Sequence, residues 1–164
     1  MELTTKGRYA VMAMVDLATN SASACQAVKS ITLADIARRQ EISQSYLEQL
    51  FARLRRHGLV DSTRGPGGGY RLAMPAEAIA IATIMAAVEE PLEITRCEAH
   101  NRIGCLSGGR RCLTHDLWDE LSRHIRAFLG ALTLADVVSR QVSKNQLSKN
   151  YDSIGPLSLV AAPP

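Results

Sequence analysis

Three cysteines and one histidine lie close together in a single stretch of the chain, residues 97–115. Cys97, Cys105, Cys112 and His115 follow the spacing C-x7-C-x6-C-x2-H. Thiolates and imidazoles together bind soft or borderline metals, and four such ligands complete a tetrahedral site or hold a cluster. The residues between them include small, polar and basic types, so the loop has little apolar surface with which to fold alone. The stretch therefore predicts a metal-binding loop.

The ligand pattern alone does not select one metal. Structural zinc sites usually contain two tight ligand pairs, and here only Cys112 and His115 are close in sequence. Zinc and an iron–sulfur cluster both remain compatible with the spacing. We expect Cys112 and His115 to share one face at the start of a helix, whose positive end favours an anionic thiolate centre. The alternatives are unrelated buried thiols with His115 as a helix cap, or a disulfide framework, which the odd thiol disfavours.

The elements that must position this loop are those of a small, largely helical protein. At 164 residues the chain is long enough for one compact domain with extensions, or for two small units. Hydrophobic residues make up 46% of the chain and aromatic residues only 4%, so aliphatic helices should fill the core. No apolar run approaches the length of a membrane span, and the first residues lack the apolar core of a signal peptide. We therefore expect a cytoplasmic protein that does not contact a membrane.

Two short helices joined by a tight turn are expected in the first half of the chain. Thr32 is placed to cap a helix over about residues 33–39, and Ser43 a second helix over about 44–57, which Gly58 ends. This is a helix-turn-helix pattern. The second helix is polar at its start and basic at its end, as in a recognition helix that reads bases first and contacts phosphates later. An ordinary amphipathic helix with a solvated face would show the same pattern.

The segment after these helices favours the DNA-binding interpretation. Two strand patterns, residues 59–63 and 70–72, flank Arg64-Gly65-Pro66-Gly67-Gly68-Gly69, which indicates a hairpin and hence a winged helix. The glycines allow a close backbone approach to DNA, and Arg64 can enter a narrow minor groove. A nucleotide-binding P-loop is excluded because no Gly-Lys-Ser/Thr follows. The candidate DNA-binding residues are Ser43, Ser45, Tyr46, Glu48, Gln49, Arg53, Arg55, Arg56, Arg64, Gly67 and Gly68.

The rest of the chain should contain a connecting helix and a long amphipathic helix. We expect the first over residues 81–89, and the second to start with a cap at Thr114. The apolar positions of the long helix form one stripe that a partner helix would bury better than this small domain would. Its members are Leu117, Leu121, Ile125, Phe128 and Leu132, with Trp118 and Leu129 beside them. A second capping pattern at Thr133 starts a last short helix that should reach about Arg140.

The expected fold class is mainly α with a small β-hairpin wing, a winged helix-turn-helix followed by a long dimerisation helix. Charge supports the DNA-binding assignment weakly, because residues 1–71 contain ten Lys or Arg and six Asp or Glu. The expected units are a DNA-binding domain over 1–74, packed with part of the dimer helix, a connecting helix over 75–96, a cluster loop over 97–115, a dimerisation helix over 114–140 and a disordered tail over 141–164.

Several segments together resemble the IscR family of bacterial winged-helix transcription factors, over about residues 1–140. They are residues 3–10, 42–51, 58–70 and 95–97, with Cys112-Leu113-Thr114-His115 and Leu117-Trp118. The resemblance implies a homodimer with one [2Fe–2S] cluster per subunit, held by Cys97, Cys105, Cys112 and His115. It also implies base reading by Ser45, Glu48 and Gln49, and a wing arginine at Arg64.

In function, the resemblance implies a regulator that represses cluster-assembly genes when its cluster is bound and acts on further sites without it. Its partners would be a roughly palindromic double-stranded DNA operator and a cluster-assembly scaffold as cluster donor. The chain departs from the family in a longer ligand spacing and in an extended loop around Cys25, which we interpret as a bystander thiol. The alternatives are a winged helix with a structural zinc or a nitric-oxide-sensing cluster. An enzyme is disfavoured because no acid–base or nucleophile constellation is evident.

Overall fold

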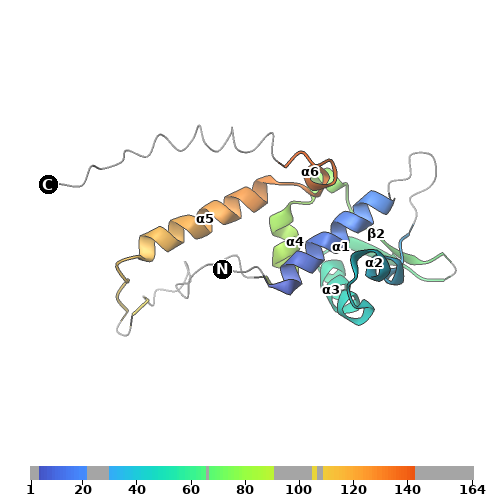
Figure 1. Ribbon diagram of the computed structural model, residues 1–164, viewed down its shortest axis with the longest axis horizontal. Helices are drawn as coiled ribbons and strands as arrows, with labels where there is room; N and C mark the ends of the chain where they lie inside the picture. The colour runs from blue at the N-terminus through green and yellow to red at the C-terminus, as the bar shows by residue number, and fades with distance from the viewer. Residues whose placement is uncertain (1–3, 22–29, 66, 91–104, 107–108, 143–164) are drawn as a thin grey trace.

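The computed structural model describes residues 4–21, 30–65, 67–90, 105–106 and 109–142. Within these ranges the chain forms a cluster of helices, a β-hairpin that projects from it, and one long helix that extends away from it (Figure 1). The elements in chain order are α1 (Thr5–Ser21), α2 (Leu33–Gln40), α3 (Gln44–Arg56), β1 (Val60–Thr63), β2 (Gly69–Leu72), the 3-10 helix η1 (Ala76–Ala78), α4 (Ile81–Ala87), α5 (His115–Ala131) and α6 (Leu134–Val138).

Helices α2 and α3 begin at the two predicted caps. Thr32 Oγ1 accepts a hydrogen bond from the Asp35 backbone N–H at 3.1 Å, and Ser43 Oγ accepts one from the Tyr46 N–H at 3.2 Å. Glu41 ends α2 in the left-handed conformation with φ 54°, which turns the chain tightly into α3. The predicted helix-turn-helix is therefore confirmed.

The core lies where α1, α2, α3, α4 and α6 meet. Its largest fully buried side chains come from the apolar faces of these helices and from residues that flank the hairpin and η1, and include Phe51, Met14, Leu17, Ile36, Leu47, Leu50, Leu54, Leu59, Ile79, Ile84 and Leu134. Phe51 also meets the Tyr70 ring edge-on, with 4.8 Å between ring centroids. These contacts fix α3 on the domain and leave its opposite face to solvent.

The wing is an antiparallel hairpin in which Val60 pairs with Leu72 and Thr63 with Gly69. Ile31, just before α2, forms a separate antiparallel bridge to the other side of β2 through two backbone hydrogen bonds with Tyr70. At Gly69 a Cβ atom would lie 2.5 Å from the Ile31 carbonyl oxygen, and φ is +155°. This contact requires glycine, and it ties the predicted wing to the helix-turn-helix.

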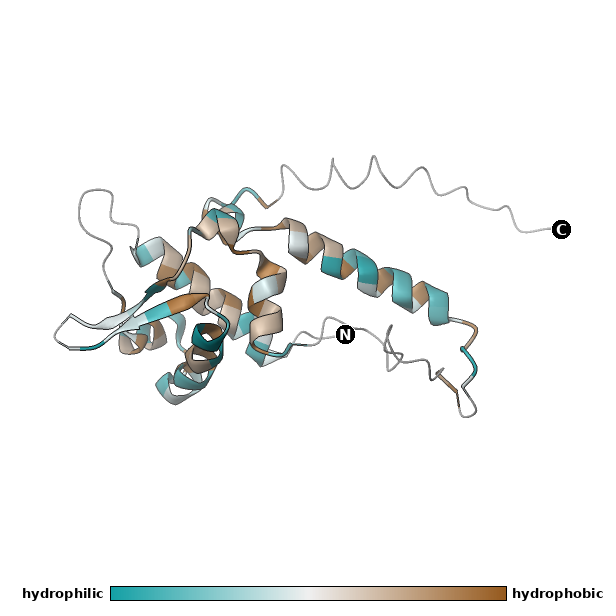
Figure 2. Ribbon diagram, turned by 180° about the vertical axis from the view of Figure 1, so that it is seen from behind, coloured by the Kyte–Doolittle hydropathy of each residue, from teal (hydrophilic) through white to brown (hydrophobic). Residues whose placement is uncertain are grey.

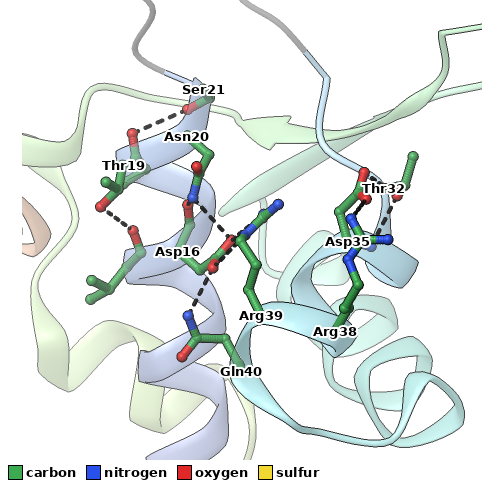
Figure 3. Close-up of polar contacts among 11 residues, drawn as sticks. Asp16, Thr19, Asn20, Ser21, Thr32, Asp35, Arg38, Arg39 and Gln40 are labelled. Atoms are coloured by element: carbon green, nitrogen blue, oxygen red, sulfur yellow. Dashed lines mark hydrogen bonds and ion pairs between the residues drawn. The ribbon is translucent and has the colours of Figure 1, made fainter.

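Buried Asp16 joins α1 to the first helix of the helix-turn-helix (Figure 3). Its carboxylate accepts hydrogen bonds from Arg39 Nε at 2.9 Å and Gln40 Nε2 at 2.8 Å, both from α2, and from Asn20 Nδ2 at 3.3 Å. Burial acts to raise the pKa of Asp16, but these hydrogen bonds and the Arg39 charge outweigh it and lower that pKa. Asp16 therefore holds α2 in place as an anion.

The chain returns to this domain after α5. Thr133 and Asp136 form a complete capping box at the start of α6, and Leu134 is fully buried. The Ile81 N–H donates to the Leu132 carbonyl, and the Leu134 N–H to the Ile79 carbonyl, both at 2.8 Å. The range 114–140 thus contains two helices, of which only α5 extends outward. The connecting helix is also shorter than predicted, because α4 ends at Ala87.

Helix α5 leaves the outer part of its apolar stripe without cover from the described residues. Leu132, which the sequence placed in the stripe, lies at the C-cap of α5 and is buried in the core at 3% exposure, and Leu129 packs against that core. Leu117 is 60% exposed and Phe128 38%, and hydrophobic residues occur along α5 beside hydrophilic ones (Figure 2). Its predicted start was wrong in one respect. Thr114 is the N-cap residue but makes no side-chain capping bond, and its hydroxyl instead accepts from Trp118 Nε1 at 3.2 Å.

No helix in the described part of the chain is long and apolar enough to cross a membrane.

Candidate functional site

The outer face of α3 presents polar side chains at the positions predicted to read bases. Ser45, Glu48 and Gln49 are exposed. The Glu48 carboxylate accepts a hydrogen bond from Gln44 Nε2 at 3.1 Å, one helical turn earlier, so its position is partly fixed before any ligand arrives. The face therefore combines a fixed acceptor with amide and hydroxyl groups, which are the groups that recognise base edges in a major groove.

Two of the predicted DNA-binding residues also hold α3 in place. The Ser43 hydroxyl caps the helix and lies 3.1 Å from the Ser45 hydroxyl. The half-buried Tyr46 ring packs edge-on against Tyr9 of α1, with 6.0 Å between centroids. Both residues therefore have structural roles within the protein.

The three arginines at the end of α3 point in different directions. Arg55 and Arg56 are exposed, and Arg55 Nη1 donates to the neutral Ser62 hydroxyl of β1 at 3.2 Å. Arg53 instead forms an ion pair with Glu89 and donates to the Val88 carbonyl at 3.4 Å. The sequence analysis grouped all three as candidate DNA-binding residues and did not indicate this division.

Glu89 and Glu90 are functional candidates that the sequence reasoning missed. Adjacent acids at the C-terminal end of an apolar helix oppose the helix dipole, so partners elsewhere in the fold were to be expected. That signal was available in the sequence. The identity of the partners was not, because it depends on how α4 docks against α1 and α3.

The wing presents its predicted residues at its tip. Arg64 follows β1 directly and is exposed, and Gly67 is exposed with φ +78°. Gly68 is half-buried, and its N–H donates to the Gly65 carbonyl at 2.8 Å, which closes the tip. The tip of the wing therefore presents the Arg64 cation beside a glycine-rich backbone.

The metal-ligand loop brings two of its four predicted ligands into contact. Cys105 Sγ lies 3.2 Å from His115 Nδ1, although ten residues separate them in sequence. Cys112 does not share a helical face with His115 as predicted, because α5 begins only at His115. A turn links the two instead, with the His115 N–H donating to the Cys112 carbonyl at 3.1 Å. The Cys112 sulfur lies 3.7 Å from the Thr114 hydroxyl.

The donor chemistry of this loop fits a metal centre, although not all of the ligand set is described. Cys97 and Cys25 fall outside the described residues. Among those described, no group of three or more His, Cys, Asp or Glu side chains converges on one point. A thiol and an imidazole nitrogen in contact are nevertheless two compatible ligands, and Cys112 lies one turn of backbone away.

Comparison with known proteins decides the family. A family profile described as an iron-dependent transcriptional regulator, Rrf2, matches residues 3–140. The chain belongs to the Rrf2 family. It is a DNA-binding transcriptional regulator with the predicted winged-helix fold, and the prediction that it is not an enzyme agrees with its relatives, which are named as regulators.

Individual relatives of this Rrf2 chain span most of its length. It is 53% identical over 141 residues to the HTH-type transcriptional regulator IscR of Yersinia pestis, covering 86% of this chain and 81% of that protein. The structure of T. potens IscR matches with a TM-score of 0.68 and 34% identity, covering 86% of this chain and 88% of that one. CymR, the global cysteine regulator of B. subtilis, matches with a TM-score of 0.69 and 29% identity, covering 85% and 98%. The predicted resemblance to the IscR family is confirmed.

Proposed function

We propose that this Rrf2 regulator senses an iron–sulfur cluster held by Cys97, Cys105, Cys112 and His115. The cluster would be [2Fe–2S], one per subunit of a homodimer, delivered by a cluster-assembly scaffold. When loaded, the protein would repress cluster-assembly genes, and without the cluster it would act on further sites. The observation that carries the proposal is the contact between Cys105 Sγ and His115 Nδ1 at 3.2 Å.

The identity of the fourth ligand explains why occupancy could serve as a signal. A neutral imidazole donates less charge to iron than a thiolate does, and histidine ligation raises the reduction potential of such clusters. A cluster held partly by His115 is therefore lost more readily than one held by four cysteines. His115→Cys should retain visible absorbance longer than wild type when both are exposed to a chelator. Equal rates of loss would contradict this role for the histidine.

An anaerobic absorption spectrum with iron and sulfide analysis tests the cofactor. Iron–sulfur clusters absorb visible light, whereas a structural zinc is colourless. Cys112→Ala should abolish the absorbance, keep the dimer, and weaken binding to only some operators. Cys25→Ala is the matched control and should behave like wild type. Should the cluster-free variant bind every operator as tightly as the loaded protein, the metal would be structural and no switch would exist.

The exposed stripe of α5 supports the homodimer. Leu117, Leu121 and Phe128 are 60%, 40% and 38% exposed, on a helix that contacts the rest of the described chain mainly through α4. A second copy of α5 would bury these side chains. Two-fold symmetry then predicts a roughly palindromic operator with half-sites about one or two helical turns apart.

The exposed groups of α3 and the wing suggest a division between reading and positioning contacts. Glu48→Ala should relax preference at one base pair by about 1–3 kcal/mol, because its carboxylate can accept from cytosine. Arg55→Ala and Arg56→Ala should weaken binding to all sequences and reduce the salt dependence. Arg64→Ala should instead cost most where the flanking minor groove is narrow. If Glu48→Ala kept the wild-type sequence preference in a binding-selection assay, Glu48 would not be a base-reading residue.

The runner-up function is a winged-helix regulator with a structural zinc or a cluster that senses nitric oxide. Zinc is favoured by one observation only, the contact of one thiol with one imidazole, which zinc also accepts. If the purified protein contained zinc and no sulfide, the site would be a structural zinc site. A cluster whose spectrum and DNA affinity respond to nitric oxide and not to iron supply would select the other.

A further inference from the structure

The end of α4 holds two acidic residues that DNA reading does not use. Glu90 is only 5% exposed, and its carboxylate accepts from the Thr4 N–H at 2.9 Å, the Thr4 hydroxyl, and the Gly7 N–H at 3.3 Å. These donors lie at the positive N-terminal end of α1, which stabilises an anion there. A Cβ atom at Gly7 would come within 2.8 Å of Glu90 Cγ. The end of α4 is therefore closely fixed against α1.

Glu89, next to this anchor, reaches the recognition helix. Its backbone is left-handed, with φ +57°, which is unfavourable for a residue with a side chain and turns it out of the line of α4. The Glu89 carboxylate pairs with Arg53 of α3, whose guanidinium also donates to the Val88 carbonyl at 3.4 Å. Lys6 Nζ donates to the Glu89 carbonyl at 3.4 Å. The Arg53 charge is thus held against the end of α4.

Arg53 differs from the two other arginines of α3 in that its charge is paired with a carboxylate. Its side chain is 32% exposed, and helical spacing places it on the flank of α3 that also carries Tyr46. Arg55 and Arg56 are exposed, and Arg55 contacts the neutral Ser62 hydroxyl, so within the described residues neither is paired with a carboxylate. Among the arginines of α3, the charge of Arg53 is the one neutralised by a carboxylate.

We propose that Glu89 withholds the charge of Arg53 from DNA phosphates and so sets the overall affinity and salt dependence of DNA binding. A carboxylate and a phosphate compete for the same guanidinium. Each phosphate contact strengthens binding to every sequence, so withholding one lowers the affinity for operator and unrelated DNA alike and leaves the base-reading face unchanged. The inference rests on the proposed placement of α3 against DNA.

Glu89→Gln tests the proposal, because it keeps the shape of the side chain and removes its charge. The full-length protein is titrated with a duplex of unrelated sequence over a series of salt concentrations. We expect the slope of log affinity against log salt to steepen by about 0.9 for each subunit. Non-specific affinity should rise roughly two- to five-fold per subunit, the range that a surface ion pair allows. Glu77→Gln, which removes an exposed carboxylate from η1, is the matched control for net charge.

Arg53→Gln completes a double-mutant cycle with Glu89→Gln, which isolates the contribution of the Arg53–Glu89 ion pair. In the Glu89→Gln background it should restore the wild-type slope, and in the wild-type background it should leave the slope unchanged. The proposal is overturned if Glu89→Gln raises the affinity for unrelated DNA no more than Glu77→Gln does. It is overturned as well if the rise in affinity persists when Arg53 is replaced. It is also overturned if Arg53→Gln alone flattens the slope. Wild-type protein whose duplex binding does not depend on salt would instead contradict the placement of α3 against DNA.

Discussion

Phe51 and Phe128 are the two phenylalanines of the chain, and their surroundings differ sharply. Phe51 of α3 is fully buried and meets Tyr70 of the wing, whereas Phe128 of α5 is 38% exposed. The first belongs to a domain whose helices are capped and whose apolar faces meet one another. The second belongs to a helix whose apolar stripe the described residues cover only at its C-terminal end. The winged helix therefore closes its own core, while the outer part of α5 leaves apolar side chains exposed among the described residues.

The metal-ligand loop shows the same contrast with the wing. The wing is fixed by backbone pairing to Ile31 and by the close approach at Gly69. In the described part of the metal-ligand loop, one thiol–imidazole contact brings Cys105 and His115 together. A second subunit and a cluster are the two components that the proposed function supplies to this half of the molecule. If the proposed function holds, the two regions depend on different conditions for their stability, and this dependence can be measured.

Replacing the two phenylalanines should give the largest difference in the free energy of unfolding between the two regions. Phe51→Ala should lower the free energy of unfolding by about 3–5 kcal/mol at any protein concentration, because it opens a cavity in the core. Phe128→Ala should change it little in dilute protein and more at concentrations where dimers form. Chemical denaturation at two protein concentrations makes the measurement. Equal losses for both variants at low concentration would mean that α5 is part of the monomer core.

Charges placed in the apolar stripe of α5 should have the next largest effect, on the assembly of the protein. Leu121→Asp combined with Phe128→Asp places two charges in the stripe, and a second copy of α5 could not bury them without a large desolvation cost. The double variant should sediment as a monomer at micromolar concentration with the circular dichroism of a folded winged helix. Thr19→Asp combined with Ala52→Asp, at exposed positions of α1 and α3, is a control for added charge. Unaltered assembly of the α5 variant would place the interface elsewhere.

The sequence predicted the winged helix well because its signals are local. Thr32, Ser43 and Gly58 mark helix ends through their own hydrogen bonds and backbone preferences, and the glycines mark the hairpin. Contacts between distant residues were not predictable in this way. The Asp16 bonds to α2 and the Arg53 pair with Glu89 depend on how helices dock, and Cys112 depends on where α5 begins. The residues named for the site therefore stay a prediction, and the geometry in which they meet was not predictable from the sequence.

Replacing Asp16 should lower the free energy of unfolding by an intermediate amount that depends on pH. Because its pKa is lowered in the folded protein, its stabilisation is complete above the unfolded-state pKa of 3.8 and is lost as the pH falls through the folded value. Asp16→Asn should cost about 1–3 kcal/mol at neutral pH, as the loss of hydrogen bonds to a charged group does. The difference from wild type should shrink in unfolding curves below about pH 4. Asp61→Asn, which disturbs an exposed pair with Arg71, should show no such convergence.

The smallest expected effect separates two threonines that the sequence assigned the same capping role. Thr133 caps α6 in a complete capping box, so Thr133→Ala should cost about 1 kcal/mol. Thr114 makes no capping bond to α5, so Thr114→Ala should change the unfolding free energy by no more than about 0.5 kcal/mol. Its hydroxyl accepts from Trp118 Nε1, and Trp118 is the single tryptophan of the chain. Thr114→Ala should therefore change the tryptophan emission while Thr133→Ala leaves it unchanged. If Thr114→Ala instead cost as much as Thr133→Ala and left the emission unaltered, α5 would begin with an ordinary cap, as the sequence predicted.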